Sequence, residues 1–251
     1  MRIPMFAANW KMHKTVLDAT AFVRELGALL DDGGEVEVVV APPFTALAAT
    51  AEVARNLPIA VAAQNLYFER EGAFTGEVSA AMVKDAGADY AIIGHSERRR
   101  LFGETDESVN RKRRAALAEG LGTIVCIGET LEERERGETL AVLDRQISRG
   151  LDGASAEEVA ALVIAYEPVW AIGTGKVATP VEADEAHRHI RARLRQWFGG
   201  DPAERCRLLY GGSVKPDNIR ELIGLEDVDG ALVGGASLEV RSFHEIITRG
   251  C

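Results

Sequence analysis

The chain has 251 residues, a length that one α/β domain can reach, and it can bury about 70–75% of the surface that its unfolded form exposes. Its composition, 47% hydrophobic and 27% charged with a mean hydropathy near zero, excludes the disordered and membrane-spanning classes. The net charge of −10 excludes nucleic acid as a partner, because phosphate backbones require clustered cations. A small phosphorylated ligand stays possible, since it responds only to local donors.

The amino terminus lacks the long apolar core and cleavage site of a secretory signal, and nowhere do about 18 apolar residues follow one another. The three cysteines, Cys126, Cys206 and Cys251, are widely spaced, which favours reduced thiols, and no pair has zinc-ligand spacing. We therefore expect a cytoplasmic protein with no membrane partner, no metal and no cofactor.

Two basic runs, at residues 98–100 and 111–114, interrupt this acidic chain. Acidic residues lie beside each run, a pattern typical of a helix face in water. We expect both runs to be solvated.

Short apolar, β-branched runs recur along the whole chain, and a stretch with helical spacing of apolar residues follows each of them. In the first unit the helical positions are Leu17, Ala21, Leu26 and Leu29. The eight predicted strands span residues 3–9, 36–41, 59–64, 90–94, 122–127, 161–166, 207–210 and 230–233.

Strands of this kind alternating with amphipathic helices predict a parallel sheet covered by helices. Eight units in 251 residues average about 31 residues each, the repeat of a closed (β/α)₈ barrel. An open doubly wound sheet would carry a GxGxxG turn after the first strand, whereas this chain has Asn9-Trp10-Lys11 there. No linker divides the sequence. We predict a single α/β domain over residues 1–251, with eight parallel strands surrounded by helices.

In such a barrel the active site lies at the carboxyl ends of the strands, and the sequence places polar or glycine residues at most of these ends. They are Asn9, Lys11, His95, Cys126, Glu129, Glu167, the run Gly211-Gly212-Ser213, and Gly234-Gly235.

The two glycine loops follow strands seven and eight, where barrels of this class hold phosphate. Glycine lets backbone N–H groups approach an anion, and a helix that starts nearby adds a favourable dipole. The alternative is that these glycines only form tight turns.

Glu167 ends the sixth strand and begins a long loop with Pro at one end and Gly-Thr-Gly near the other. Such a loop is typical of a hinged lid attached to a catalytic base, although a rigid loop with Glu167 in a salt bridge is the alternative. His95 precedes Ser96 and Glu97, which resemble a helix start whose field keeps an imidazole neutral. Lys11 is a fixed positive charge or, less readily, a Schiff-base amine.

Eight segments together resemble the triosephosphate isomerase family, in the family's order and over the whole chain. They are Asn9-Trp10-Lys11-Met12, Gln64-Asn65, residues 72–79, residues 94–99, Cys126-Ile127-Gly128-Glu129, residues 165–176, residues 210–214 and residues 229–238.

The resemblance implies a TIM barrel that interconverts dihydroxyacetone phosphate and D-glyceraldehyde 3-phosphate through an enediolate, in glycolysis and gluconeogenesis. It implies Glu167 as the base, neutral His95 as the electrophile and Lys11 as the electrostatic stabiliser. The substrate is then bound by Asn9, Lys11, Gly173, Ser213, Gly234 and Gly235. Glu97 and Cys126 are supporting residues.

The resemblance also implies a lid that closes over the substrate and excludes water. Its residues are Pro168, Val169, Trp170, Ala171, Ile172, Gly173, Thr174, Gly175, Lys176, Val177 and Ala178. Members of the family are generally homodimers, which makes Thr75 and His13 expected dimer contacts. His13 and Ala8 depart from the residues common in relatives, which affects only the interface.

Another phosphate-binding barrel, an epimerase or a different isomerase, is the nearest rival interpretation. It would keep the glycine loops but lack Asn-Trp-Lys together with Glu-Pro-Val-Trp. A barrel retained only for binding would have lost Lys11, His95 or Glu167, and all three are present.

Overall fold

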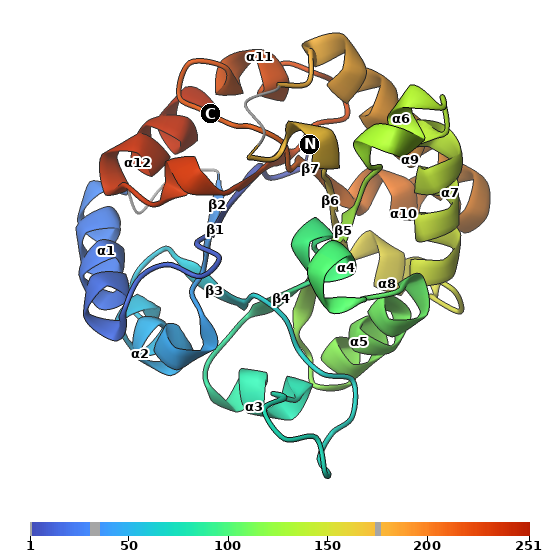
Figure 1. The fold of residues 1–251 in the computed structure, drawn as a ribbon. Helices are drawn as coiled ribbons and strands as arrows, with labels where there is room; N and C mark the ends of the chain where they lie inside the picture. Colours follow the sequence, from blue (N-terminus) through green and yellow to red (C-terminus); the bar gives the residue numbers. More distant parts are fainter. Residues whose placement is uncertain (1, 31–35, 174–176) are drawn as a thin grey trace.

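The computed structural model describes residues 2–30, 36–173 and 177–251. Its strands form a closed barrel in which every neighbouring pair is parallel and the order around the barrel follows the sequence (Figure 1). The strands are β1 (Met5–Asn9), β2 (Glu37–Ala41), β3 (Ala60–Ala63), β4 (Tyr90–Ile93), β5 (Gly122–Ile127), β6 (Val163–Tyr166), β7 (Arg207–Tyr210) and β8 (Gly230–Val233). Each lies within its predicted run, so the predicted barrel is confirmed.

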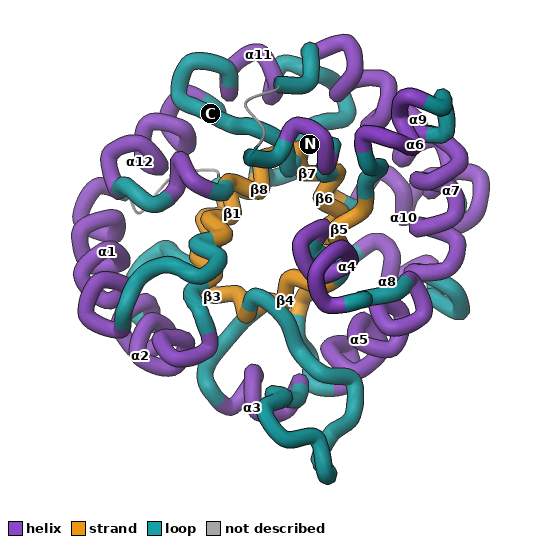
Figure 2. The backbone as a smooth tube through the Cα atoms, in the orientation of Figure 1, coloured by secondary structure: helices purple, strands orange, loops and turns teal. Residues whose placement is uncertain are grey.

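Helices surround the barrel on all sides, as Figure 2 shows. One outer helix for each of the eight strands completes the eight units: α1 (Val16–Leu29), α2 (Phe44–Ala54), α3 (Ala80–Asp85), α5 (Asp106–Ala118), α7 (Thr139–Gly150), α9 (Pro180–Phe198), α11 (Ile219–Ile223) and α12 (Val240–Arg249). Additional helices of three to seven residues are α4 (Ser96–Phe102), α6 (Leu131–Glu135), α8 (Ala156–Ala160), α10 (Gly200–Arg205), and the 3₁₀ turns η1 (Val169–Ala171) and η2 (Gly235–Ser237). No described helix is long and apolar enough to cross a membrane.

Both faces of the strands are buried, which is why they appear in the sequence as nearly continuous apolar runs. Alternate residues point into the barrel, among them Met5, Val39, Ile92 and Leu209, and form one packed cluster. The residues between them pack against the surrounding helices in a second, larger cluster. The barrel is therefore a filled core whose chemistry is confined to its ends.

The predicted apolar face of the first helix is largely wrong. Leu17 is 80% exposed, and Leu29 also faces water, whereas Phe22 and Leu26 are buried. The inner face of α1 instead repeats at three- and four-residue steps from Ala19. That face begins with a small alanine, which a search for large apolar residues overlooks.

The prediction that both basic runs are solvated is also wrong in part. Lys112 and Arg113 are almost fully buried, and Arg99 keeps only 17% of its side chain exposed, whereas Arg100 faces water. Each buried cation contacts a carboxylate: Lys112 pairs with Glu104, Arg113 with Glu158 and Arg99 with Asp106. Pairing is what makes such burial tolerable, and the basic runs alone do not reveal these partners.

Candidate active site

A cavity of about 260 Å³ opens at the carboxyl ends of the strands. The eight residues predicted to act on or bind the substrate all line it, although they come from five different loops. They are Asn9, Lys11, His95, Glu167, Gly173, Ser213, Gly234 and Gly235. The fold therefore gathers into one small volume residues that span most of the chain.

Glu167 directly follows β6, and its side chain is 2% exposed. Its backbone N–H donates to the carbonyl oxygen of Ile127 at 2.7 Å, which extends the β5–β6 ladder by one residue. One carboxylate oxygen lies 2.9 Å from Nε2 of His95, and the other accepts the backbone N–H of Ser96 at 2.8 Å. Both oxygens are therefore already hydrogen-bonded.

Two glycines make room for Glu167. A Cβ at Gly128 would stand 1.7 Å from the backbone oxygen of Glu167, and a Cβ at Gly211 would stand 2.9 Å from its Cγ. Gln146, on α7, holds the Gly128 backbone by accepting its N–H at 2.7 Å. These close approaches fix Glu167 between the ends of β5 and β7.

The pKa of Glu167 lies below its ordinary value, although burial alone would raise it. The charge and hydrogen bond of His95 lower the pKa most, and the Ser96 amide and the charge of Lys11 lower it further. Glu167 is therefore a buried carboxylate held in its ionised, basic form.

His95 is the residue at which α4 begins, and its Nδ1 accepts the backbone N–H of Glu97 at 3.2 Å. In the neutral ring Nδ1 then carries no proton, and the proton lies on Nε2, the nitrogen turned toward Glu167. Burial lowers the pKa of His95, but the charge and hydrogen bond of Glu167 and the charge of Glu97 together outweigh burial and raise it. The amide at the start of α4 thus sets the tautomer of the neutral His95 ring. The sequence predicted that this helix start would also keep the ring neutral, but in this arrangement the pKa of His95 is raised.

Lys11 follows β1 with a backbone φ of 51°, a conformation that few residues other than glycine adopt. Asn9 stabilises this turn, because its Oδ1 accepts the Lys11 backbone N–H at 3.0 Å. The Lys11 ammonium lies 2.6 Å from a carboxylate oxygen of Glu97. Asn9 and Glu97 therefore fix the cation from opposite ends of its side chain.

The segment after Glu167 is attached to a second buried carboxylate, Glu129. Trp170 donates its indole N–H to Glu129 at 2.8 Å, and the Tyr166 hydroxyl contacts both Glu129 oxygens at 3.1–3.2 Å. The Val169 backbone N–H donates to the Glu129 carbonyl at 3.1 Å. The predicted lid residues Thr174, Gly175 and Lys176 lie outside the described residues.

Comparison with known proteins agrees with this geometry. The family model for triosephosphate isomerase matches residues 4–250. Triosephosphate isomerase from Carboxydothermus hydrogenoformans is 57% identical over 247 residues, which cover 98% of this chain and 98% of that relative. Triosephosphate isomerase from Chloroflexus aurantiacus is 54% identical over 247 residues, which cover 98% of this chain and 99% of that relative. The crystal structure of triosephosphate isomerase from Bartonella henselae matches with a TM-score of 0.89, at 40% identity and 98% coverage of both chains.

The chain belongs to the triosephosphate isomerase family. It is an enzyme, an aldose–ketose isomerase that interconverts dihydroxyacetone phosphate and D-glyceraldehyde 3-phosphate. This membership overrules the rival interpretations, a different phosphate-binding barrel and a barrel without activity. Its substrate is a triose phosphate.

Of the other residues predicted for this triosephosphate isomerase family member, the lid residues Ala171 and Ile172 also line the cavity, whereas Cys126, His13 and Thr75 do not. Cys126 is fully buried among the inward-facing residues of the barrel, and burial raises the pKa of its thiol far above the ordinary value. His13 and Thr75 are exposed. The long loop between β3 and α3, which carries Thr75, projects away from the barrel in Figure 1.

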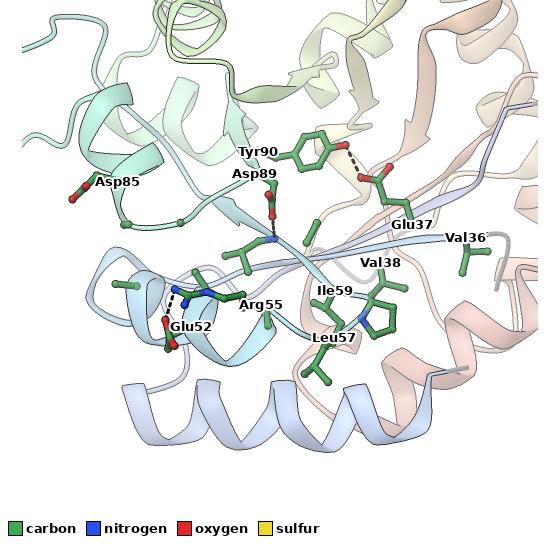
Figure 3. Close-up of a pocket in the computed structure, with 18 of the residues that line it drawn as sticks. Val36, Glu37, Val38, Glu52, Arg55, Leu57, Ile59, Asp85, Asp89 and Tyr90 are labelled. Atoms are coloured by element: carbon green, nitrogen blue, oxygen red, sulfur yellow. Dashed lines mark hydrogen bonds and ion pairs between the residues drawn. The ribbon is translucent and has the colours of Figure 1, made fainter. Parts of the chain in front are cut away.

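A larger hollow of about 970 Å³ lies at the opposite, amino-terminal ends of β2, β3 and β4 (Figure 3). Its most buried polar groups are already paired: the Tyr90 hydroxyl donates to Glu37, which also pairs with Arg207, and Asp89 accepts the Val61 backbone N–H. This end of a barrel serves stability, and the paired groups here agree with that role. Within the described part of the chain, no three His, Cys, Asp or Glu residues are grouped as metal ligands.

Sequence reasoning missed the residues that hold the predicted catalytic side chains from behind. Gln146 contacts Gly128 from 18 positions away, and the Ser96 N–H that binds Glu167 belongs to the backbone. Neither contact leaves a local pattern in the sequence, because each depends on how separate elements pack.

Proposed function

We propose that Glu167 is the base that moves a proton between the two carbons of the triose phosphate. It takes a proton from C1 of dihydroxyacetone phosphate, and the electron pair of that C–H bond forms a C1=C2 double bond as the carbonyl oxygen becomes an oxyanion. The protonated carboxyl then returns a proton to C2. The C1 hydroxyl proton passes by way of His95 to the oxyanion on C2, which leaves an aldehyde at C1 and a hydroxyl at C2. The observation that carries this proposal is the buried, ionised carboxylate 2.9 Å from His95 in a substrate-sized cavity.

Glu167 has to leave both of its present partners to do this, because neither oxygen is free to accept a carbon-bound proton. Rotation of its side chain toward the cavity breaks the contacts with His95 and Ser96. The low pKa caused by those contacts then rises, because burial remains. A base that becomes stronger as it reaches the substrate suits proton abstraction from carbon.

His95 is the electrophile in this proposal. With Nδ1 accepting the Glu97 N–H, the proton of the neutral ring lies on Nε2, which can donate to the carbonyl and enediolate oxygens. When Glu167 turns away, the charge that raises the pKa of His95 also departs, and burial then favours the neutral ring.

Lys11 stabilises the negative charge of the intermediate. Its ammonium is ion-paired with Glu97, which favours the role of a fixed charge over that of an amine nucleophile. Asn9 positions the Lys11 backbone and contributes a polar wall to the cavity. Cys126, packed in the barrel interior, supports the floor of the site.

The phosphate binds at the glycine-rich side of the cavity, to backbone amides of Gly173, Ser213, Gly234 and Gly235. Residues 168–178 act as the lid, with Gly173 reaching the phosphate, and its closure excludes water from the enediolate. The contacts of Val169 and Trp170 with Glu129 hold the first end of this lid in the arrangement described above.

The active form is a homodimer in the cytoplasm, and the reaction serves glycolysis and gluconeogenesis. Exposed Met12, Phe74, Leu101 and Phe102 support a dimer, because large apolar side chains on the surface are typical of an interface. Thr75 and His13 belong to the same group of loops. No metal or cofactor takes part in the proposed steps.

The variant Glu167→Gln tests the proposal. It keeps the shape of the side chain but removes the basic carboxylate, so we expect kcat to fall by roughly 10³-fold or more with little change in KM. The exposed Glu185→Gln on α9 is the matched control and should keep wild-type turnover. Wild-type-like turnover of Glu167→Gln would remove Glu167 as the base.

A further inference from the structure

Arg99 lies on α4, four residues after His95, and its guanidinium reaches back to the ends of two strands. Nε donates to the carbonyl oxygen of Gly94 at 2.7 Å, and one terminal nitrogen donates to the carbonyl oxygen of Cys126 at 3.2 Å. The other terminal nitrogen lies 2.6 Å from Asp106, at the start of α5. All three guanidinium nitrogens are thus used.

The two carbonyls belong to the segment that carries His95 and to the segment that anchors the backbone of Glu167. Gly94 directly precedes His95. Cys126 precedes Ile127, whose carbonyl oxygen accepts the backbone N–H of Glu167 at 2.7 Å. One side chain therefore connects the backbone that carries His95 with the backbone that anchors Glu167.

These carbonyls lie where the β4–β5 ladder ends and the strands diverge into loops, since the last paired residues there are Ile93 and Val125. Arginine suits this position because its planar group presents several donors in a fixed fork. A lysine ammonium is a compact point charge without that fork. Asp106 fixes the guanidinium from the far side, and Arg145 lies 3.6 Å from the other oxygen of Asp106.

Arg99 does not line the active-site cavity. It borders a separate hollow of about 470 Å³ on the outer side of α4, together with Ser96, Gly128 and Arg145. The Ser96 amide and the Gly128 backbone in this wall are the groups that contact Glu167 on its other side. Arg99 thus stands behind both catalytic residues without touching the substrate.

We propose that Arg99 is a positioning residue for the isomerisation: it fixes His95 and Glu167 relative to each other by holding the carbonyls of Gly94 and Cys126. This inference rests on the proposed roles of these two residues. It predicts that loss of Arg99 lowers kcat more than it changes KM, because misplacement affects the transition state more than substrate binding.

Chemical rescue of Arg99→Ala is the test. We expect kcat with dihydroxyacetone phosphate to fall by about 10- to 100-fold, since a shift of about 1 Å between catalytic groups has an effect of that size. The outer hollow gives a small cation access to the vacated position. Guanidinium chloride at about 50 mM, far below denaturing concentrations, should restore much of kcat, whereas equal concentrations of methylammonium or sodium chloride should not. The neighbouring exposed Arg100→Ala is the control and should neither lose kcat nor respond to guanidinium.

Arg99→Ala with wild-type kcat, or a loss of kcat that only follows the loss of folded protein in thermal melts and is not rescued, would overturn the inference. If Arg99→Ala does not fold, Arg99→Lys decides, because it keeps the charge opposite Asp106 but not the fork to both carbonyls. A lowered kcat with an unchanged melting temperature supports positioning, and an unchanged kcat contradicts it. The proposed roles are judged separately by Glu167→Gln, whatever Arg99 variants do.

Discussion

At the scale of single residues, burial disfavours the ionised side chains that the proposed chemistry needs, and specific contacts with neighbouring groups offset this effect of burial. Burial raises the pKa of Glu167, yet His95, the Ser96 amide and Lys11 together hold it below its ordinary value of 4.5. Lys11 in turn is paired with Glu97. Removing one of these neighbours should therefore change the titration of the base without touching the base itself.

We predict this change in the pH dependence of kcat/KM, which reports the free enzyme. Glu167 must be ionised to act, so kcat/KM of the wild type should be lost only as pH falls through the depressed pKa. In His95→Gln the largest lowering contribution is gone, burial prevails, and the acidic limb should move to higher pH. The substrate phosphate titrates equally in the wild-type and His95→Gln experiments, so any difference between the two acidic limbs comes from the enzyme. Coinciding acidic limbs would contradict the proposed pairing.

The sequence indicated His95, Glu167 and Lys11 as candidate catalytic residues because each stands at the end of a recognisable strand. It did not identify Arg99 or Lys112, whose burial depends on Asp106 and Glu104 lying opposite them. A cation in a basic run looks the same whether water or a carboxylate faces it. The difference arises only from the packing of α4 and α5 against the barrel.

At the scale of elements, the close approach of the segments after β5 and β6 positions the proposed base, Glu167. The backbone of Glu167 lies so close to Gly128 that no side chain fits between them. The strands themselves were predictable, because burial on both faces leaves long apolar runs. The inner face of α1 was not predictable, since it begins at Ala19, a side chain too small to stand out as a core residue in the sequence.

We predict that Gly128→Ala destabilises the protein by about 3 kcal/mol, because its Cβ would overlap the Glu167 carbonyl oxygen. Activity of the folded fraction should fall as well, since the Glu167 backbone must shift. Gly103→Ala is a suitable control: its φ of 66° also disfavours a side chain, but no atom lies within 4 Å of the new Cβ. It should cost only about 1 kcal/mol of backbone strain. Equal losses in thermal or denaturant unfolding would show that the close approach does not matter.

At the scale of the whole molecule, the site stands on one end of a filled barrel, and the loop carrying Thr75 extends beyond it (Figure 1). A charged side chain placed in an apolar interface without a partner is strongly unfavourable. We therefore predict that Thr75→Arg weakens the proposed homodimer by about 100-fold. Sedimentation velocity at decreasing concentration measures this, with exposed Thr248→Arg on α12 as the control. An unaltered profile for Thr75→Arg would contradict the interface.

The central claim is that side chains of this protein move a proton through an exchangeable acid, with no metal. The most direct measurement is isomerisation of dihydroxyacetone phosphate in heavy water with EDTA, followed by NMR of the D-glyceraldehyde 3-phosphate formed. Because a carboxyl proton exchanges with solvent, the product should carry deuterium at C2 while turnover is undiminished by the chelator. A product without deuterium, or activity that returns only when a divalent metal is added, would contradict the account.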